Sequence, residues 1–143
     1  RLPELNASYL QTQIKDINKV INYREKLFKR YYENFSNWLK DEFIICNKDK
    51  HKDKYNYHAF TIILKKKERE IFLKYLKNQK IIAFISFEAL HLSKMGKKWL
   101  TKNTNLKNTN EIIKKIVRLP MHNKLSIQEV DYISKKVKDY FKK

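Results

Sequence analysis

The side chains that most often carry chemistry are few in this 143-residue chain, and their spacing is restrictive. One cysteine, Cys46, excludes an internal disulfide and any zinc site built from several cysteines. One glycine, Gly96, excludes the G-x-G-x-x-G dinucleotide loop and the Walker P-loop, which both need several glycines. The histidines do not follow the H-E-x-x-H spacing of a zinc protease. They are His51, His58, His91 and His122.

Two features resemble reactive sites but have simpler explanations. Cys46 has no partnered histidine and no helix start nearby, so we expect a small buried residue and not a nucleophile. The lysine-rich stretch 47–56 mixes Lys, Asp and His as a metal or phosphate loop would. Because ligand spacing is missing, we expect a solvated connection there and no metal.

The net charge of +18, from 33 Lys and Arg against 15 Asp and Glu, favours polyanionic partners. Only five of the basic residues are arginine, and arginine forks are what usually read base edges. Lysines are spread along the chain, a pattern that AT-rich codon usage would also produce. Non-specific electrostatic binding to nucleic acid is therefore expected, and a small basic nucleic-acid-binding module stays open as an alternative function.

The longest purely apolar run, residues 81–85, is far shorter than the ~20 residues of a membrane-spanning helix. With no secretory signal, a cytoplasmic location and no membrane span are expected. The first residue is arginine, so we expect either a processed chain or a piece of a longer reading frame.

A helical lead-in over residues 1–40 is the first element that could position these groups. Apolar residues recur every three to four positions from 4 to 39, with a bend expected near Asn22. Its aromatic stripe could stack bases, but helical spacing favours core packing. The stripe consists of Phe28, Tyr31, Tyr32 and Phe35.

Residues 41–143 predict a small α/β sandwich, which makes 1–143 a single domain of the mixed α/β or α+β class. Strands are expected at 43–46, 57–64, 81–87 and 116–119, with about three forming the sheet. The 81–87 strand is nearly all apolar, so we expect cover on both faces. Helices are expected at 66–79, 110–116 and 127–141, the last beginning at a capping box formed by Ser126 and Glu129.

Four segments, in order, resemble the DegT/StrS sugar aminotransferases. Residues 1–10 (RLPELNASYL) are similar to the family's R-L-x-E-L-x-A-A helix start, and 56–60 (NYHAF) to a strand that leads into an apolar run. Residues 83–91 (AFISFEALH) resemble the H-Y-x-P-L-H strand and loop. Residues 118–122 (RLPMH) with Leu125 and Ser126 are similar to the L-P-x-x-x-x-L-S ending. Within the family, the resemblance is greatest to enzymes acting on dTDP-4-oxo-6-deoxy-glucose.

The resemblance implies the C-terminal small domain of a fold-type I enzyme that uses pyridoxal phosphate. Such an enzyme passes the amine of glutamate through the cofactor, an electron sink, to a nucleotide-linked keto sugar. The Schiff-base lysine and the large cofactor-binding domain would lie upstream of Arg1, so this chain alone is expected to hold no cofactor and no catalytic residue. The implied partners are a missing large domain or a second copy in a homodimer. A separately encoded structural subunit is a further possibility.

Site residues follow from the resemblance position by position. His91 matches the family pattern, whereas Ser86 stands for its first histidine and Phe87 for its tyrosine. With His58, these three are the substrate-side candidates, and Arg1 could face a cofactor phosphate. Ser86 and Phe87 are equally well explained as plain strand residues, and His58 as a strand histidine with a satisfied hydrogen bond.

Overall fold

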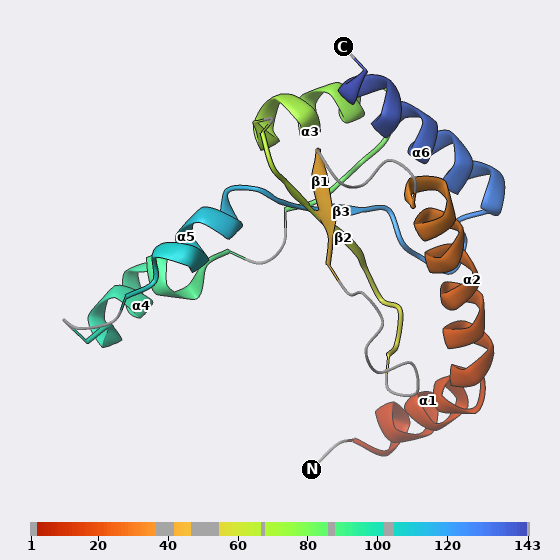
Figure 1. Cartoon of the computed structure of the whole chain (residues 1–143). Coiled ribbons are helices and arrows are strands. Elements are labelled where there is room, and N and C mark those ends of the chain that lie inside the picture. The colour runs from red at the N-terminus through yellow and green to blue at the C-terminus, as the bar shows by residue number, and fades with distance from the viewer. Residues whose placement is uncertain are drawn as a thin grey trace.

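Two helices, and not one, begin the chain in the computed structural model, which describes residues 3–36, 42–46, 55–66, 68–85, 88–101 and 105–142 (Figure 1). Helix α1 (Glu4–Lys15) ends at Asp16, and α2 (Ile17–Phe35) follows directly. The bend therefore lies at Asp16 and not near Asn22, as aspartate is a poor helix-interior residue. Residues 37–39 of the expected helix lie outside the described part of the chain.

The remaining elements follow in chain order. They are β1 (Phe43–Ile45), β2 (Phe60–Leu64), α3 (Arg69–Asn78), the 3₁₀ turn η2 (Leu90–Leu92), α4 (Lys94–Trp99), α5 (Lys107–Ile113), β3 (Ile116–Leu119) and α6 (Ile127–Phe141). No described helix is both long enough and apolar enough to cross a bilayer.

The three strands form one antiparallel sheet in the order β1-β2-β3. Phe43 pairs with Leu64 at one end of the sheet, and Phe60 pairs with Leu119 at the other. Alternation along each strand sends one set of side chains toward the helices and the other set away from them. The predicted sheet of about three strands flanked by helices is therefore confirmed, although β2 begins at Phe60 and not at residue 57.

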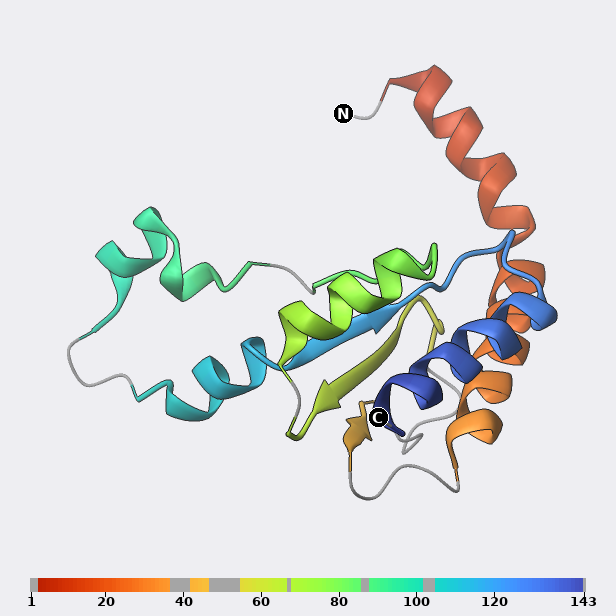
Figure 2. The ribbon, with the colours of Figure 1, turned by 90° about the horizontal axis from the view of Figure 1, so that it is seen from above.

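Helices α2, α3 and α6 cover one face of the sheet and build the core there (Figure 2). The aromatic stripe of α2 packs in this core as expected, except that Tyr32 faces outward. The ring of Tyr31 stacks on Phe60 at 4.7 Å between centroids, and its hydroxyl donates to the carbonyl of Pro120 at 3.0 Å. Burial raises the pKa of Tyr31, so the hydroxyl stays a donor.

Residues 81–85, the described part of the strand predicted at 81–87, do not form the doubly covered strand that the apolar sequence indicated. They meet β3 through one isolated bridge, in which Phe84 and Arg118 exchange backbone hydrogen bonds of 2.9 and 2.8 Å. Ile81 is buried, but Ile82, Phe84 and Ile85 are 66%, 59% and 46% exposed. Apolar composition predicts burial, but it does not tell whether the covering surface belongs to the same chain.

An arm made of η2, α4 and α5 projects away from the sheet between α3 and β3 (Figures 1 and 2). Ser93 caps α4 by accepting a hydrogen bond from the backbone of Gly96 at 2.9 Å. Arg69 donates to the carbonyl of Ile113 and so ties the end of α5 to the start of α3. The sequence predicted neither helix nor strand between 88 and 107, and the described residues there form the 3₁₀ turn η2 and the short helix α4.

Candidate functional site

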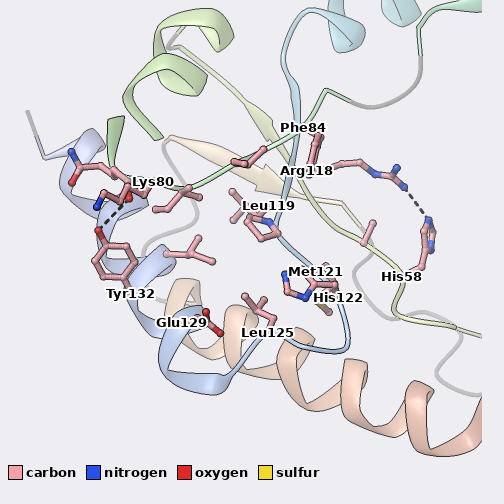
Figure 3. A pocket seen from close by; sticks show the side chains of 16 residues that line it. His58, Lys80, Phe84, Arg118, Leu119, Met121, His122, Leu125, Glu129 and Tyr132 are labelled. Carbon is pink, nitrogen blue, oxygen red and sulfur yellow. Dashed lines mark hydrogen bonds between the residues drawn. The ribbon is translucent and has the colours of Figure 1, made fainter. Parts of the chain in front are cut away.

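A groove of about 760 Å³ opens at the edge of the sheet beside β3 (Figure 3). It lies between the residues that precede β2, the turn that follows α3, the end of β3, and α6 with the loop before it. Its floor is apolar because Ile81, Leu119 and Ile133, which line it, also belong to the core. A concave apolar surface with a few polar groups on its rim is the usual form of a ligand site.

A fixed hydrogen-bond chain occupies one end of the groove. Arg118 Nη2 donates to His58 Nε2 at 2.9 Å, and His58 Nδ1 is 2.8 Å from Asn56 Oδ1. A guanidinium can only donate, so Nε2 accepts this bond and the opposite ring nitrogen, Nδ1, faces the amide oxygen of Asn56. The ring holds the guanidinium in place through this bond.

The other end of the groove carries Lys80 and Tyr132 (Figure 3). The Tyr132 hydroxyl donates to the carbonyl of Gln79 at 3.3 Å, joining α6 to the turn after α3. Glu129 is the acidic lining residue, and Ser126 holds its carboxylate through bonds of 2.7 and 2.8 Å. These hydrogen bonds lower the pKa of Glu129, so the carboxylate stays ionised.

A second, smaller hollow of about 330 Å³ lies at the root of the arm. Arg69, Glu88 and Ser93 supply its polar atoms. His91 does not line it; its Nε2 lies 2.7 Å from the amide oxygen of Asn110, which joins η2 to α5. This histidine therefore has a structural partner within the arm.

The two candidates that the structure describes, His58 and His91, are not brought together. His58 lines the groove beside β3, whereas His91 lies in the arm. Arg1, Ser86 and Phe87 lie outside the described residues. Sequence reasoning missed Arg118 and Lys80 as groove residues, although Arg118 stands in the RLPMH segment that carried the family resemblance.

Cys46, the single cysteine, follows β1 and is half-buried. Burial raises the pKa of its thiol, which makes the thiol a poor nucleophile, although the residue is not fully buried as the sequence predicted. Among the residues described, no cluster of His, Cys, Asp and Glu could hold a metal ion.

The described residues do not fit pyridoxal phosphate. A Schiff-base lysine needs a buried setting that lowers its pKa. Within the described ranges, Thr61 and Ser134 are the only buried polar or charged residues, so every lysine there is at least partly exposed. The described residues thus supply no reaction step through that cofactor.

Comparison with known proteins gave one family and a consistent set of structures. The sequence profile of the DegT/DnrJ/EryC1/StrS aminotransferase family matches residues 1–138. No match was found among curated protein sequences.

Solved aminotransferase structures share the fold. PseC of Helicobacter pylori, involved in pseudoaminic acid biosynthesis, is 21% identical with a TM-score of 0.85, covering 99% of this chain and 38% of that one. DesV of S. venezuelae is 15% identical with a TM-score of 0.86, covering 100% and 38%. A family member from Brucella abortus is 19% identical with a TM-score of 0.81, covering 100% and 37%. The chain thus spans well under half the length of these structures, and the expected fold class is confirmed.

Proposed function

The chain belongs to the DegT/DnrJ/EryC1/StrS aminotransferase family, and from this premise we propose that it is the C-terminal small domain of a sugar aminotransferase that uses pyridoxal phosphate. The observation that carries the proposal is the match over residues 1–138 in a chain whose described lysines are all at least partly exposed. Family membership supports the reaction class. The absence of a buried lysine among the described residues supports a covering role, and not a catalytic one, for this part.

We propose further that the whole enzyme moves the amine of glutamate to a nucleotide-linked 4-keto-6-deoxy sugar for lipopolysaccharide or other surface polysaccharide. The resemblance to the dTDP-4-oxo-6-deoxy-glucose aminotransferase of enterobacterial common antigen synthesis supports this choice. Glutamate and nucleotide sugars are cytoplasmic metabolites, so the enzyme would work in the cytoplasm. Substrate contact by His91, Ser86, Phe87 or His58, and cofactor contact by Arg1, remain part of this proposal.

The small domain would close over a large domain and contribute to a homodimer. Exposed apolar side chains support this arrangement: α1 buries none of its residues, Leu5 is 82% exposed, and Trp99 of the arm is 80% exposed. Apolar surface of this extent is a feature of protein interfaces.

Two experiments test the proposal. The nucleotide sequence upstream of Arg1 should encode, in frame, a cofactor domain with a Schiff-base lysine; a stop or frameshift there would indicate a decayed remnant. The isolated 143-residue chain, titrated with pyridoxal phosphate, should show no internal-aldimine absorbance band and no glutamate-dependent amination. Joined to the upstream domain, it should bind one cofactor per chain and convert a dTDP-4-keto-6-deoxy sugar. A stoichiometric aldimine on the isolated chain would overturn the proposal.

The alternative, a nucleic-acid-binding module, rests on the net charge of +18 alone. Retention on a polyanion should fall steeply with salt and show no preference among DNA or RNA sequences. A strong preference for one nucleic acid sequence would favour this alternative over the aminotransferase role.

A further inference from the structure

We propose that the groove beside β3 binds a small amphiphilic oxyanion, a molecule with one carboxylate or phosphate group on an apolar body, and that Arg118 contacts the oxyanion. The site is defined by groups of this chain, and its test does not require the proposed function to hold. All of the groups that form it lie within the described chain (Figure 3).

The apolar part of the groove has the size and lining of a small-molecule site. Its volume of about 760 Å³ lies within the ~300–1,000 Å³ that ligand pockets usually have. Ile81, Leu119 and Ile133 form a buried floor, while the rings of Phe84 and Tyr132 stand exposed on opposite rims. A planar or branched apolar body would remove both rings and the floor from water.

The charged part is complementary to an oxyanion. Arg118 presents a planar fork that matches carboxylate and phosphate, and its bond to His58 fixes the orientation of that fork. His58 is itself held by Asn56, whose side-chain oxygen also accepts the backbone N–H of His58 at 3.2 Å. His58 is therefore a positioning residue for Arg118. Lys80 adds a second positive charge at the opposite end, which favours an anion throughout the groove.

Glu129, the acidic residue that lines the groove, does not cancel the positive potential of Arg118 and Lys80. Both contacts of the Glu129 carboxylate go to Ser126, one to its backbone N–H and one to its hydroxyl. That carboxylate is therefore already engaged in capping α6, and its charge is partly offset by the helix N-terminus.

Backbone conformation gives an independent reason to look here. Tyr57, with φ of 48°, and Lys80, with φ of 60°, are the two non-glycine residues with left-handed backbone in the part of the chain described. Lys80 lines the groove, and Tyr57 directly precedes His58, which lines the other end. Left-handed backbone at a non-glycine residue is costly and recurs at ligand sites; at Lys80 it also completes the C-terminal cap of α3.

The test uses the 143-residue chain and four probes: phenyl phosphate, phenylacetate, benzyl alcohol and inorganic phosphate. Backbone amide chemical shifts in ¹H–¹⁵N spectra, recorded as each probe is added, give the affinity of the probe and the residues at which it binds. Phenyl phosphate or phenylacetate should move the amides of residues 80–84 and 118–122, and should bind at least tenfold more tightly than benzyl alcohol or inorganic phosphate. The tighter of the two aromatic probes tells whether the natural head group is phosphate or carboxylate.

Variants separate the proposed contact from general basicity. Arg118→Gln should weaken the binding of the tighter probe at least tenfold, whereas Lys135→Gln, which removes one exposed charge from α6 outside the groove, should change it less than twofold. His58→Gln, which keeps an acceptor for Arg118, should bind better than His58→Leu. Lys80→Gln, at an exposed position, gives a second charge-removing variant if Arg118→Gln fails to fold.

Three outcomes would overturn the proposal: shifts located in the arm or α1, equal binding of phenyl phosphate and inorganic phosphate, or an unchanged affinity in folded Arg118→Gln.

Discussion

A bidentate ion pair joins α2 to α6. Arg30 Nε and Nη2 lie 2.7 and 2.8 Å from the two carboxylate oxygens of Asp131, and Asn34 donates to the same carboxylate at 2.8 Å. The hydrogen bond from Arg30 lowers the pKa of Asp131 below its ordinary value of 3.8, against the opposing effect of burial. The geometry is better than that of most surface pairs, although both side chains are partly exposed.

The ion pair predicts a specific acid sensitivity. Because the pKa of Asp131 is lower in the folded state, its stabilising contribution is complete above the ordinary value of 3.8 and is lost as pH falls through the folded pKa. Asp131→Asn should therefore lower Tm at neutral pH and flatten the decline of Tm between about pH 4 and pH 2. Thermal unfolding followed by circular dichroism measures this, with Asp139→Asn on the same helix as the control. If Tm of Asp131→Asn depended on pH as the wild-type Tm does, the ion pair would not be the source of the acid sensitivity.

Gly96 is required by close packing and not by backbone conformation. A Cβ at this position would lie 1.8 Å from the carbonyl oxygen of Leu90 and 2.7 Å from its carbon. Both are backbone atoms, so the turn η2 and helix α4 would have to move apart.

Gly96→Ala should therefore destabilise the arm by about 1–3 kcal/mol, the usual cost of overpacking. Hydrogen exchange of the arm amides should accelerate while that of the core strands stays unchanged. Met95→Ala, at the exposed neighbouring position, is the matched control and should leave the arm protected. Equal protection in both variants would show that the arm relaxes freely around the added methyl group.

Helix α3 ends in a Schellman motif built on a residue that is unsuited to it. The N–H of Ile81 donates to the carbonyl of Leu76, and the N–H of Lys80 donates to that of Lys77, both at 2.9 Å. Lys80 takes the left-handed position with φ of 60°. Glycine usually occupies this position because it has no Cβ to clash there.

Lys80→Gly should stabilise the chain by about 1 kcal/mol through relief of this strain. The matched substitution Lys77→Gly, in the last turn of α3 where the backbone is right-handed, should destabilise it by about the same amount. Urea unfolding of the two variants and the wild type measures the free energy of unfolding, which should rise in Lys80→Gly and fall in Lys77→Gly. A loss of stability in Lys80→Gly would mean that contacts of the lysine side chain outweigh the strain.

Local signals in the sequence predicted α6 well. The capping box is present, with Ser126 Oγ accepting from the Glu129 N–H at 3.2 Å and the Glu129 carboxylate accepting from the Ser126 N–H at 2.7 Å. The helix begins at Ile127 as predicted because both partners of the box lie within one turn.

Features set by distant residues were not predictable in the same way. The groove forms because the register of β2 on β3 places His58 beside Arg118, sixty positions apart, and because α3 turns back toward α6. No short sequence pattern predicts the contact between His58 and Arg118. The exposure of Ile82 and Phe84 was also not predicted, because an apolar sequence indicates burial without showing which surface provides it.

On the scale of the whole molecule, apolar surface is concentrated away from the sheet core. Leu5, Tyr9 and Ile14 stand exposed along α1, and Leu90 and Trp99 stand exposed on the arm. One side of the molecule is therefore a packed two-layer body, and two projections carry side chains that would be more stable in contact with another surface.

The isolated chain should consequently self-associate as concentration rises, as seen by sedimentation velocity. A double variant, Leu5→Ser with Trp99→Ser, should shift the distribution toward monomer, because Leu5 is 82% exposed on α1 and Trp99 is 80% exposed on the arm. Lys74→Ser, at an exposed position of α3, controls for the loss of a large surface side chain. A wild-type chain that stays monomeric at all concentrations would contradict this reading of the surface.

The insertion of the arm between α3 and β3 bears on how freely this molecule can diverge. The entropy lost in closing a loop rises only with the logarithm of its length, so the pairing of β2 with β3 is almost indifferent to how many residues the arm contains. The described contacts of α4 are mainly with η2, within the arm itself. Insertions and substitutions there would leave the folding of the body nearly unaffected, which makes the arm the segment where a new specificity could evolve at the least cost to stability.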